Sequence, residues 1–273
     1  MPVPAPKPAQ APVLAAPVRQ TASLPAAGAA ARPVLPVPPG LYVVVIDPGH
    51  GGNDPGAVSE SGTREKEVVF KMAKALKSAL ETSGRYTVHL TRTDDRFIEL
   101  SRRVQMARDL DADLFISLHA DILDGVKVQG ASIYTLSEKA SDREAARLAR
   151  KENAVDLLPG VDIESESQDV ISILVDLTQR DTKNNSVRFA RALLPEFEAR
   201  SIDLVNNTHR FGPFRVLTAP DVPSVLIELG FLSSKGDEKN LLDEGWRTRM
   251  ADAIRAGVDT YFSSRTAFAV PLE

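Results

Sequence analysis

Residues 42–56, YVVVIDPGHGGNDPG, join an apolar, β-branched run to a loop that carries His50 among four glycines. The run Tyr42–Ile46 is short and followed by turn residues, which is typical of a strand buried on both faces of a parallel sheet. His50 would then follow the carboxyl end of that strand. Open α/β sheets bind ligands beyond these ends, and glycines permit close approach. The loop is therefore a candidate functional site.

Composition narrows the classes of function. The chain has 273 residues, 43% of them hydrophobic, a net charge of -4 and no cysteine. Interspersed charges without a basic stripe argue against a nucleic-acid partner. The lack of cysteine excludes disulfides and thiolate metal sites. No apolar run approaches the roughly 20 residues that span a bilayer, so we expect no transmembrane segment, and no secretory signal is present in the sequence as given.

The chain divides by composition into a linker and one domain. Residues 1–40 are rich in proline and alanine without hydrophobic periodicity, which predicts a disordered linker. Residues 41–265 are long enough to bury one sizeable core, and residues 266–273 would form a tail. We therefore expect a single folded domain.

Strand and helix patterns alternate along the domain. Strands are predicted at 42–46, 86–91, 113–118, 130–136, 214–218 and 224–229. Helices are predicted at 63–83, 100–110, 141–158, 168–178, 185–200 and 237–262. This alternation predicts an α/β fold with a mostly parallel or mixed sheet of about six strands flanked by helices. Residues 137–184 far exceed the usual connection of about 2 to 6 residues, so they are predicted to be an inserted, helical regulatory segment.

Ionisable residues follow the carboxyl ends of several predicted strands. His50, His119 and Glu228 each lie at or just past such an end, so they converge if these ends share one edge of the sheet. The helix at 63–83 adds a carboxylate. Steps of three and four from Glu65 reach apolar residues, whereas the same steps from Glu67 reach lysines and a serine. We expect Glu65 to face inward and Glu67 to face solvent.

These residue types have a known chemistry together. Two histidines and a carboxylate with an open fourth position form a ligand set typical of hydrolytic zinc sites. A further carboxylate must still move a proton, and Glu228, within the apolar run SVLIELGF, suits this role. Asp47 either orients a ligand histidine or forms the turn. Alternatively, the histidines are ordinary hydrogen-bonded residues, and Glu65 favours the positive end of its helix.

Several motifs also carry a family resemblance. They are IDPGHGGNDPGA, REKEVVF, LTRTDDRF with LSRRVQMA, DLFISLHAD and PSVLIELGFLSS. In order and spacing they resemble the motifs of the zinc-dependent N-acetylmuramoyl-L-alanine amidases, the type-3 family of bacterial cell-wall hydrolases. The resemblance implies that His50, Glu65 and His119 hold one zinc ion and that Glu228 is catalytic. It also implies peptidoglycan as the substrate, cleavage between the lactyl group of N-acetylmuramic acid and L-alanine, and a periplasmic location.

The inserted segment is predicted to regulate this site. Its first helix has an apolar stripe, and Glu152 falls on the stripe while Asp156 continues it. A carboxylate there would pair with Arg147 or Arg150, lie exposed, or occupy the open metal position and block the enzyme. Resemblance to amidases of cell separation implies such an inhibitory helix and a LytM-type activator protein. An apolar second helix, with Val170, Ile171, Ile173, Leu174 and Leu177, would offer the activator a docking surface.

Two other functions fit the same residues. A zinc carboxypeptidase or endopeptidase acting on the stem peptide would use the same metal chemistry. A catalytically silent cell-wall binding module would need none of it, and retention of the four predicted site residues argues against this alternative.

Overall fold

The computed structural model describes residues 41–123, 128–157 and 174–268. These residues form one six-stranded sheet in the order β2-β1-β3-β6-β4-β5. The strands are β1 (Tyr42–Pro48), β2 (Tyr86–Leu90), β3 (Leu114–His119), β4 (Ala131–Leu136), β5 (Leu204–Gly212) and β6 (Ser224–Glu228). The predicted α/β fold with about six strands is confirmed.

The sheet is mixed, and its parallel part places the site. Strands β2, β1, β3 and β6 are parallel, so the carboxyl ends of β1, β3 and β6 lie at one edge. Strand β4 pairs with β6 in the antiparallel direction and with β5 in the parallel direction. The register places His119 directly beside Glu228 at the shared edge.

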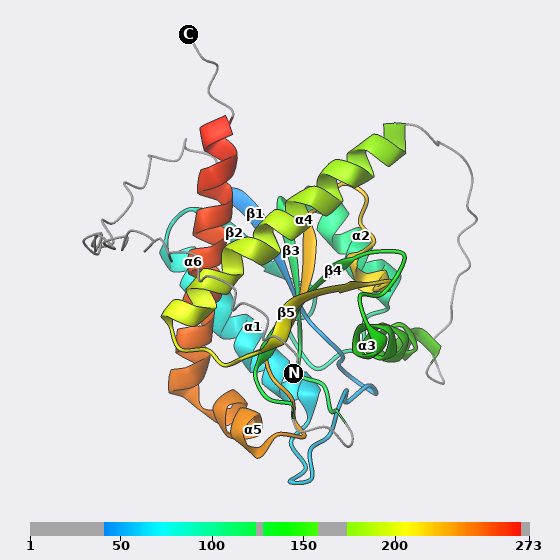
Figure 1. Ribbon diagram of the computed structural model, residues 1–273, viewed down its shortest axis with the longest axis vertical. Coiled ribbons are helices and arrows are strands. Elements are labelled where there is room, and N and C mark those ends of the chain that lie inside the picture. The colour runs from blue at the N-terminus through cyan, green and yellow to red at the C-terminus, as the bar shows by residue number, and fades with distance from the viewer. Residues whose placement is uncertain (1–40, 124–127, 158–173, 269–273) are drawn as a thin grey trace, which may run out of the picture. The chain divides into compact units, whose positions relative to one another are not determined.

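Helices cover both faces of the sheet (Figure 1). One face carries α1 (Glu65–Thr82), α4 (Leu174–Ala199) and α6 (Glu244–Phe268), with α5 (Lys235–Leu242) against α6. The other face carries α2 (Leu100–Asp109) and α3 (Arg143–Asn153). Among the helices of the described ranges, none has the length and apolar character needed to cross a membrane.

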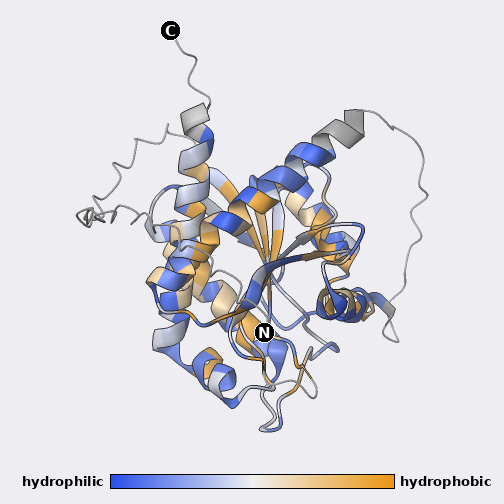
Figure 2. Ribbon diagram, viewed as in Figure 1, coloured by the Kyte–Doolittle hydropathy of each residue, from blue (hydrophilic) through white to orange (hydrophobic). Residues whose placement is uncertain are grey.

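The central strands are buried on both faces because their alternate residues enter different clusters. Val44 and Ile46 pack beneath α1, whereas Val45, which lies between them, packs toward α2 and α3. All three side chains are fully buried, as predicted for the first strand. Figure 2 shows the same concentration of apolar residues on the strands and on the helices beside them.

The predicted strand at 214–218 is wrong. Residues Arg215–Leu217 form a short 3-10 helix, which is apolar because Val216 and Leu217 pack in the cluster beneath α2 and α3. The sixth strand is instead β5, whose sequence LVNNTHRFG is mostly half-buried or exposed because β5 lies at the edge of the sheet. A polar edge strand lacks the continuous apolar run that identifies a central strand.

The helices after β4 also differ from the prediction. Helix α3 and a short 3-10 helix, Val155–Leu157, replace the helix predicted at 141–158. Residues 158–173, with part of the second predicted helix, lie outside the described residues, as do 1–40. From Leu174 one continuous helix, α4, runs to Ala199 and joins β4 to its parallel neighbour β5. Residues 174–184 are therefore part of α4, which has no break between the helices predicted at 168–178 and 185–200.

The carboxyl-terminal helix predicted at 237–262 is two helices. The break falls at Asp243, whose side chain accepts a hydrogen bond from the Trp246 backbone N–H at 2.6 Å and so caps α6. Helix α6 continues to Phe268, three residues beyond the boundary predicted at 265.

Candidate metal centre

His50 is presented by a tight loop after β1. The loop reverses through a bridge between Gly51 and Asp54, and His50 itself has a φ of 60°. The Asp54 Oδ2 atom lies 2.7 Å from His50 Nδ1. This contact occupies Nδ1 and turns Nε2 toward the carboxyl ends of the strands, the arrangement that an imidazole needs to bind a metal through Nε2.

Glu65 enters the site from the first turn of α1. Its Oε1 atom accepts a hydrogen bond from the Ala120 N–H and its Oε2 atom from the Ala57 N–H, both at 2.8 Å. Burial alone would raise the pKa of Glu65, but His50 and His119 hold it well below its usual value. Glu65 is therefore a fixed, ionised carboxylate. Glu67 is exposed, as the helical phase predicts.

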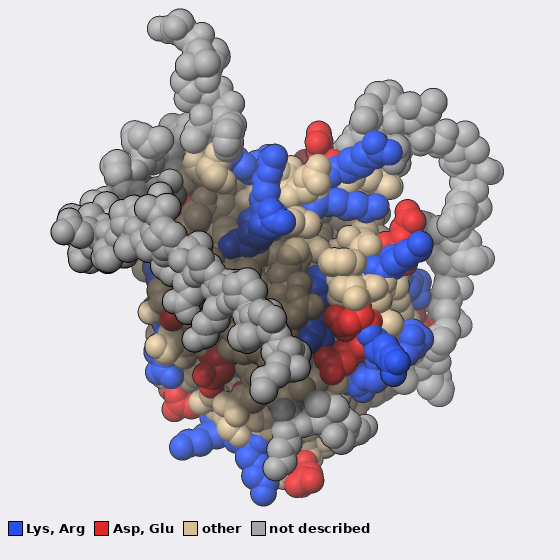
Figure 3. Space-filling view, viewed as in Figure 1, with Lys and Arg blue, Asp and Glu red and all other residues tan. Residues whose placement is uncertain are grey.

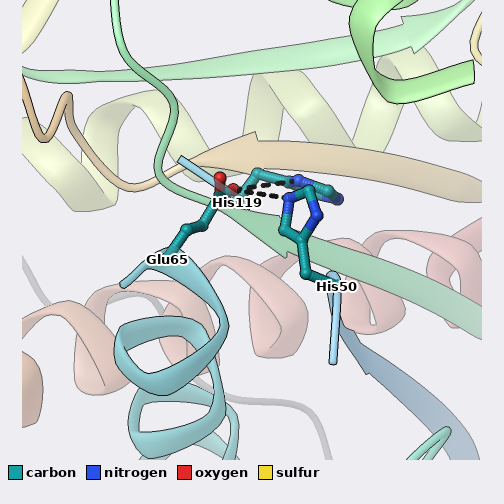
Figure 4. A group of neighbouring side chains, drawn as sticks. All are labelled: His50, Glu65 and His119. Atoms are coloured by element: carbon teal, nitrogen blue, oxygen red, sulfur yellow. Dashed lines mark hydrogen bonds and ion pairs between the residues drawn. The ribbon is translucent and has the colours of Figure 1, made fainter. Parts of the chain in front are cut away.

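The third group, His119, ends β3 and completes the cluster. Glu65 Oε1 lies 3.0 Å from His50 Nε2 and 3.2 Å from His119 Nδ1. The two imidazole rings are 4.9 Å apart and nearly perpendicular, at 78°. Figure 4 shows the three side chains pointing toward one another from three separate elements. The structure thus brings the three predicted ligands together.

The chemistry of this cluster fits a divalent cation. One ligand atom from each residue lies within 4.8 Å of the others. His50 Nε2 is buried 3.0 Å from Glu65 Oε1, but it makes no hydrogen bond of good geometry among the described residues. Burial would lower the pKa of His50, but the carboxylates of Glu65 and Glu152 raise it to about 10, so the site favours added positive charge. Two imidazole nitrogens and one carboxylate oxygen are a ligand set that suits zinc.

Glu228 lies beside this cluster at the end of β6. Its Oε2 atom accepts a hydrogen bond of 3.0 Å from the Asp121 N–H, whereas its Oε1 atom is buried and has no partner within the described part of the chain. Burial raises the pKa of Glu228 well above its usual value, and His119 offsets only part of this effect. A buried carboxyl with one free oxygen next to a metal position is suited to proton transfer.

Glu152 of α3 contacts the same imidazoles. Its Oε2 atom lies 3.1 Å from His119 Nδ1 and 3.6 Å from His50 Nε2, and the residue is only 3% exposed. Arg147 pairs with Asp121 instead, and Arg150 is exposed, so neither arginine is the partner of Glu152. Of the alternatives for Glu152, the structure thus favours contact with the two predicted histidine ligands over pairing with an arginine or exposure.

Asp156, the other acidic residue considered on this stripe, lies elsewhere. Its carboxylate accepts a hydrogen bond from the Leu100 N–H at 3.0 Å and pairs with Arg215 at 3.2 Å. These contacts tie the end of the α3 region to α2 and to the 3-10 helix at Arg215–Leu217. Asp156 is thus an anchor of this region and not a group that faces the imidazoles.

Comparison with known families agrees with this geometry. A family model described as N-acetylmuramoyl-L-alanine amidase matches residues 44–260. The chain belongs to this family. It is 39% identical over 224 residues to the amidase AmiA of Escherichia coli K12, covering 82% of this chain and 77% of that protein. It is 38% identical over 228 residues to AmiC of Escherichia coli O6:H1, covering 83% of this chain and 54% of AmiC. The chain thus spans about half the length of AmiC.

Solved structures of the family share the fold. The catalytic domain of CwlV from Bacillus (Paenibacillus) polymyxa var. colistinus matches with a TM-score of 0.57 and 28% identity, covering 81% of this chain and 98% of that one. The amidase AmiC2 of Nostoc punctiforme matches with a TM-score of 0.58 and 27% identity, covering 82% and 98%. The arrangement of sheet and helices is therefore the one found in solved amidases.

The role suggested for Asp47 needs correction. Its carboxylate accepts hydrogen bonds from Thr91 Oγ1, Arg103 Nη1 and Ser117 Oγ, at 2.5 to 2.8 Å, rather than from a ligand imidazole. The residue that orients His50 is Asp54, which sequence reasoning missed. Its position four residues after His50, in a loop with glycines that permit a reversal, was the available signal.

Two glycines of the motif are required by close packing. A Cβ atom on Gly49 would lie 2.5 Å from the His119 ring. Gly56 has a φ of 66°, and a Cβ atom there would lie 2.7 Å from both Glu65 Oε2 and His50 Cδ2. The glycines thus let the loop backbone pass directly against the predicted ligands, as expected from the sequence.

Proposed function

We propose that the chain is a zinc-dependent amidase that cleaves peptidoglycan between the lactyl group of N-acetylmuramic acid and L-alanine of the stem peptide. The observation that carries this proposal is the convergence of His50, Glu65 and His119 at 3.0 to 3.2 Å, with Glu228 alongside, in a chain of the amidase family. Peptidoglycan lies outside the cytoplasm, so the enzyme would act in the periplasm.

The ligand residues would hold one zinc ion through His50 Nε2, His119 Nδ1 and Glu65. Zinc supplies a Lewis acid that polarises a carbonyl and lowers the pKa of water to about 7. Groups that do not themselves bind the metal hold the ligand side chains in place. Asp54 fixes the His50 ring, and two backbone N–H groups fix Glu65. Such outer contacts orient metal ligands and increase their affinity.

Glu228 would move the proton. Its Oε1 atom, which has no hydrogen-bond partner among the described residues, would accept a proton from the attacking water and deliver it to the nitrogen of the leaving L-alanine amine. The backbone N–H of Asp121 holds Oε2, so the carboxyl keeps its orientation through both steps. The amide bond breaks, water adds its oxygen to the carbonyl carbon, and the stem peptide leaves with a free amine.

The resting enzyme would be autoinhibited by α3. Glu152 lies within 3.1 to 3.6 Å of both imidazoles, so it would fill the position that the substrate carbonyl and the attacking water require. An activator of the LytM type would draw the helix away. The docking residues suggested by the sequence, Val170 to Leu177, are outside the residues whose side chains are described.

Side chains around α3 would hold the inhibitory helix in place. Lys151 and Arg147 both pair with Asp121, which follows His119 by two residues. At the start of the helix, Glu144 pairs with Arg210 of β5 at 2.6 Å. Figure 3 shows acidic and basic side chains side by side over α3. Several of these groups are partly exposed, so each pair contributes little and the helix can be released.

Digestion of purified sacculi tests the proposed reaction. The chain carrying Glu152→Gln should release free stem peptides that begin with L-alanine, detected by mass spectrometry. The same chain with Glu228→Gln added should release almost none, and one with Glu67→Gln added should behave as the parent, because Glu67 is exposed.

Other products would favour the other functions. Shortened peptides that remain on the glycan would identify a carboxypeptidase or endopeptidase and overturn the amidase. A Glu152→Gln chain that bound sacculi and whose turnover of them was unchanged when Glu228→Ala was added would identify a silent binding module.

A further inference from the structure

Two arginines close to the metal centre are buried without belonging to the ligand set. Arg92 and Arg103 are each only 2% exposed. They come from the motifs LTRTDDRF and LSRRVQMA, which the proposed chemistry does not use. Burying a guanidinium is costly unless its N–H groups meet acceptors, so the acceptors indicate what the two residues do.

Their acceptors are successive carbonyl groups of the His50 loop. The Pro48 carbonyl accepts from Arg92 Nε at 2.9 Å and from Arg103 Nη1 at 3.1 Å. The Gly49 carbonyl accepts from Arg92 Nη2 at 3.0 Å, and the His50 carbonyl accepts from Arg103 Nη2 at 2.9 Å. Every carbonyl from the end of β1 to the ligand itself is thus held by a guanidinium.

Arg92 also ties this loop to the helix that carries the carboxylate ligand. The same Nη2 atom that binds the Gly49 carbonyl donates to the Lys66 carbonyl at 2.8 Å. Gly49 precedes His50, and Lys66 follows Glu65. One nitrogen therefore links the neighbours of two ligands that lie on separate elements, and so holds the distance between them.

Arg103 ties the loop to the sheet and to α2. Its Nη1 atom donates to Asp47 Oδ1 at 2.7 Å, and Asp47 in turn accepts from Ser117 of β3, two residues before His119. Its Nε atom donates to the Ile98 carbonyl at 2.7 Å, just before α2 begins. The second guanidinium thus connects the His50 loop to the strand that carries the third ligand.

The loop needs such support because its backbone is unfavourable. His50 has a φ of 60°, in the left-handed region, which is unfavourable for an L-residue. Gly51 and Gly52, which follow, also have positive φ values of 125° and 58°. A segment with these angles keeps one conformation only where its surroundings impose it.

We propose that Arg92 and Arg103 are positioning residues that set the zinc affinity of the site by holding the His50 loop at a fixed distance from Glu65 and His119. This inference rests on the proposed metal centre. Lysine keeps the positive charge but presents one nitrogen in place of the planar fork, so it cannot bridge the same carbonyl groups.

The test compares Arg92→Lys and Arg103→Lys with the unmodified full chain. The zinc dissociation constant is measured by competition with a chromogenic chelator, and the melting of the zinc-free protein is followed by circular dichroism. Each variant should bind zinc about 10 to 100-fold more weakly while its zinc-free form remains folded. Arg102→Lys, an exposed arginine of α2, should leave the constant unchanged.

Three outcomes would overturn the inference. Folded variants with the zinc affinity of the unmodified chain would show that the arginines do not position the ligands. Loss of the fold in both variants would show that they support the fold rather than the ligand spacing. An unmodified chain that binds no zinc would overturn the proposed metal centre together with this inference, whereas the first two outcomes leave the proposed amidase intact.

Discussion

Glu65 and Glu152 are two carboxylates that contact the same pair of imidazoles, but they are held in different ways. Both oxygens of Glu65 accept backbone hydrogen bonds, and its side chain is fully buried. Glu152 contacts the histidines through Oε2, and its Oε1 atom has no hydrogen-bond partner among the described residues. Backbone hydrogen bonds thus fix both oxygens of Glu65, whereas Glu152 contacts the site through Oε2.

The helices that carry them differ in the same sense. Helix α1 buries a long apolar stripe between the sheet and α6. Helix α3 buries only Ala145, Leu148 and Ala149 as hydrophobic residues, and two of these are alanines. Its ion pairs use Lys151 and Arg147, whose side chains are 38% and 39% exposed. The proposed permanent ligand, Glu65, thus lies on a core helix, and the proposed removable one, Glu152, lies on a helix with a smaller apolar contact.

Replacement by glutamine should change activity in opposite directions at the two carboxylates. The loss expected for Glu65→Gln is larger than the gain expected for Glu152→Gln. Glu65→Gln replaces the charged carboxylate of the proposed ligand with a neutral amide, which binds a metal more weakly. We therefore expect amidase activity in the Glu152→Gln background to fall by about 100-fold or more. Release of stem peptides from sacculi measures the rate. An unchanged rate would mean that Glu65 is not a ligand.

Glu152→Gln should raise the rate of the unmodified chain. An amide is a weaker ligand and carries no charge to attract the imidazoles, so the open state becomes more populated, by about tenfold for each 1.4 kcal/mol of lost contact. The assay is the same digestion of sacculi without an activator. Arg150→Gln, an exposed change on the same helix, serves as the control. Equal rates in all three proteins would contradict autoinhibition.

Lys151→Met should loosen α3 and raise the rate of digestion, but by less than Glu152→Gln does. It removes one ion pair with Asp121 while the main chain of Asp121 still holds Glu228. A partly exposed pair is worth on the order of 1 kcal/mol, so the rate should rise by up to about fivefold. A rise as large as that of Glu152→Gln would mean that this pair, and not the contact with the histidines, holds the helix.

Salt gives the smallest expected change. Ions screen partly exposed pairs such as Glu144 with Arg210, so the rate of the unmodified chain should increase about two- to threefold between low salt and 0.5 M NaCl. The Glu152→Gln variant provides the comparison, because its helix no longer closes the site. An equal increase in both proteins would assign the salt effect to substrate binding.

The proposed metal ligands and Glu228 could be predicted from the sequence more completely than the segments around them. His50, His119 and Glu228 could be placed because buried parallel strands have distinctive sequences and share one edge, and the phase of α1 separated Glu65 from Glu67. Strand β5 was not predicted, because an edge strand need not be apolar. Helical phase placed Glu152 on an inward stripe but left its partner open among arginines, solvent and the metal position.

The contacts between distant segments could not be predicted. Arg103 and Asp47 lie in separate motifs, and nothing in their spacing shows that they pair beside the His50 loop. The pairing of Lys151 with Asp121 likewise depends on how the chain returns after β4. Such contacts are set by tertiary packing, which local periodicity does not encode.

Zinc binding tests the central claim most directly. Metal analysis and a chelator competition would be carried out on the full chain and on His50→Ala, whose imidazole comes from the loop rather than from the core. The account predicts one tightly bound zinc in the unmodified protein and, in His50→Ala, an affinity lower by about 100-fold or more. Equal zinc affinity in the two proteins would contradict it.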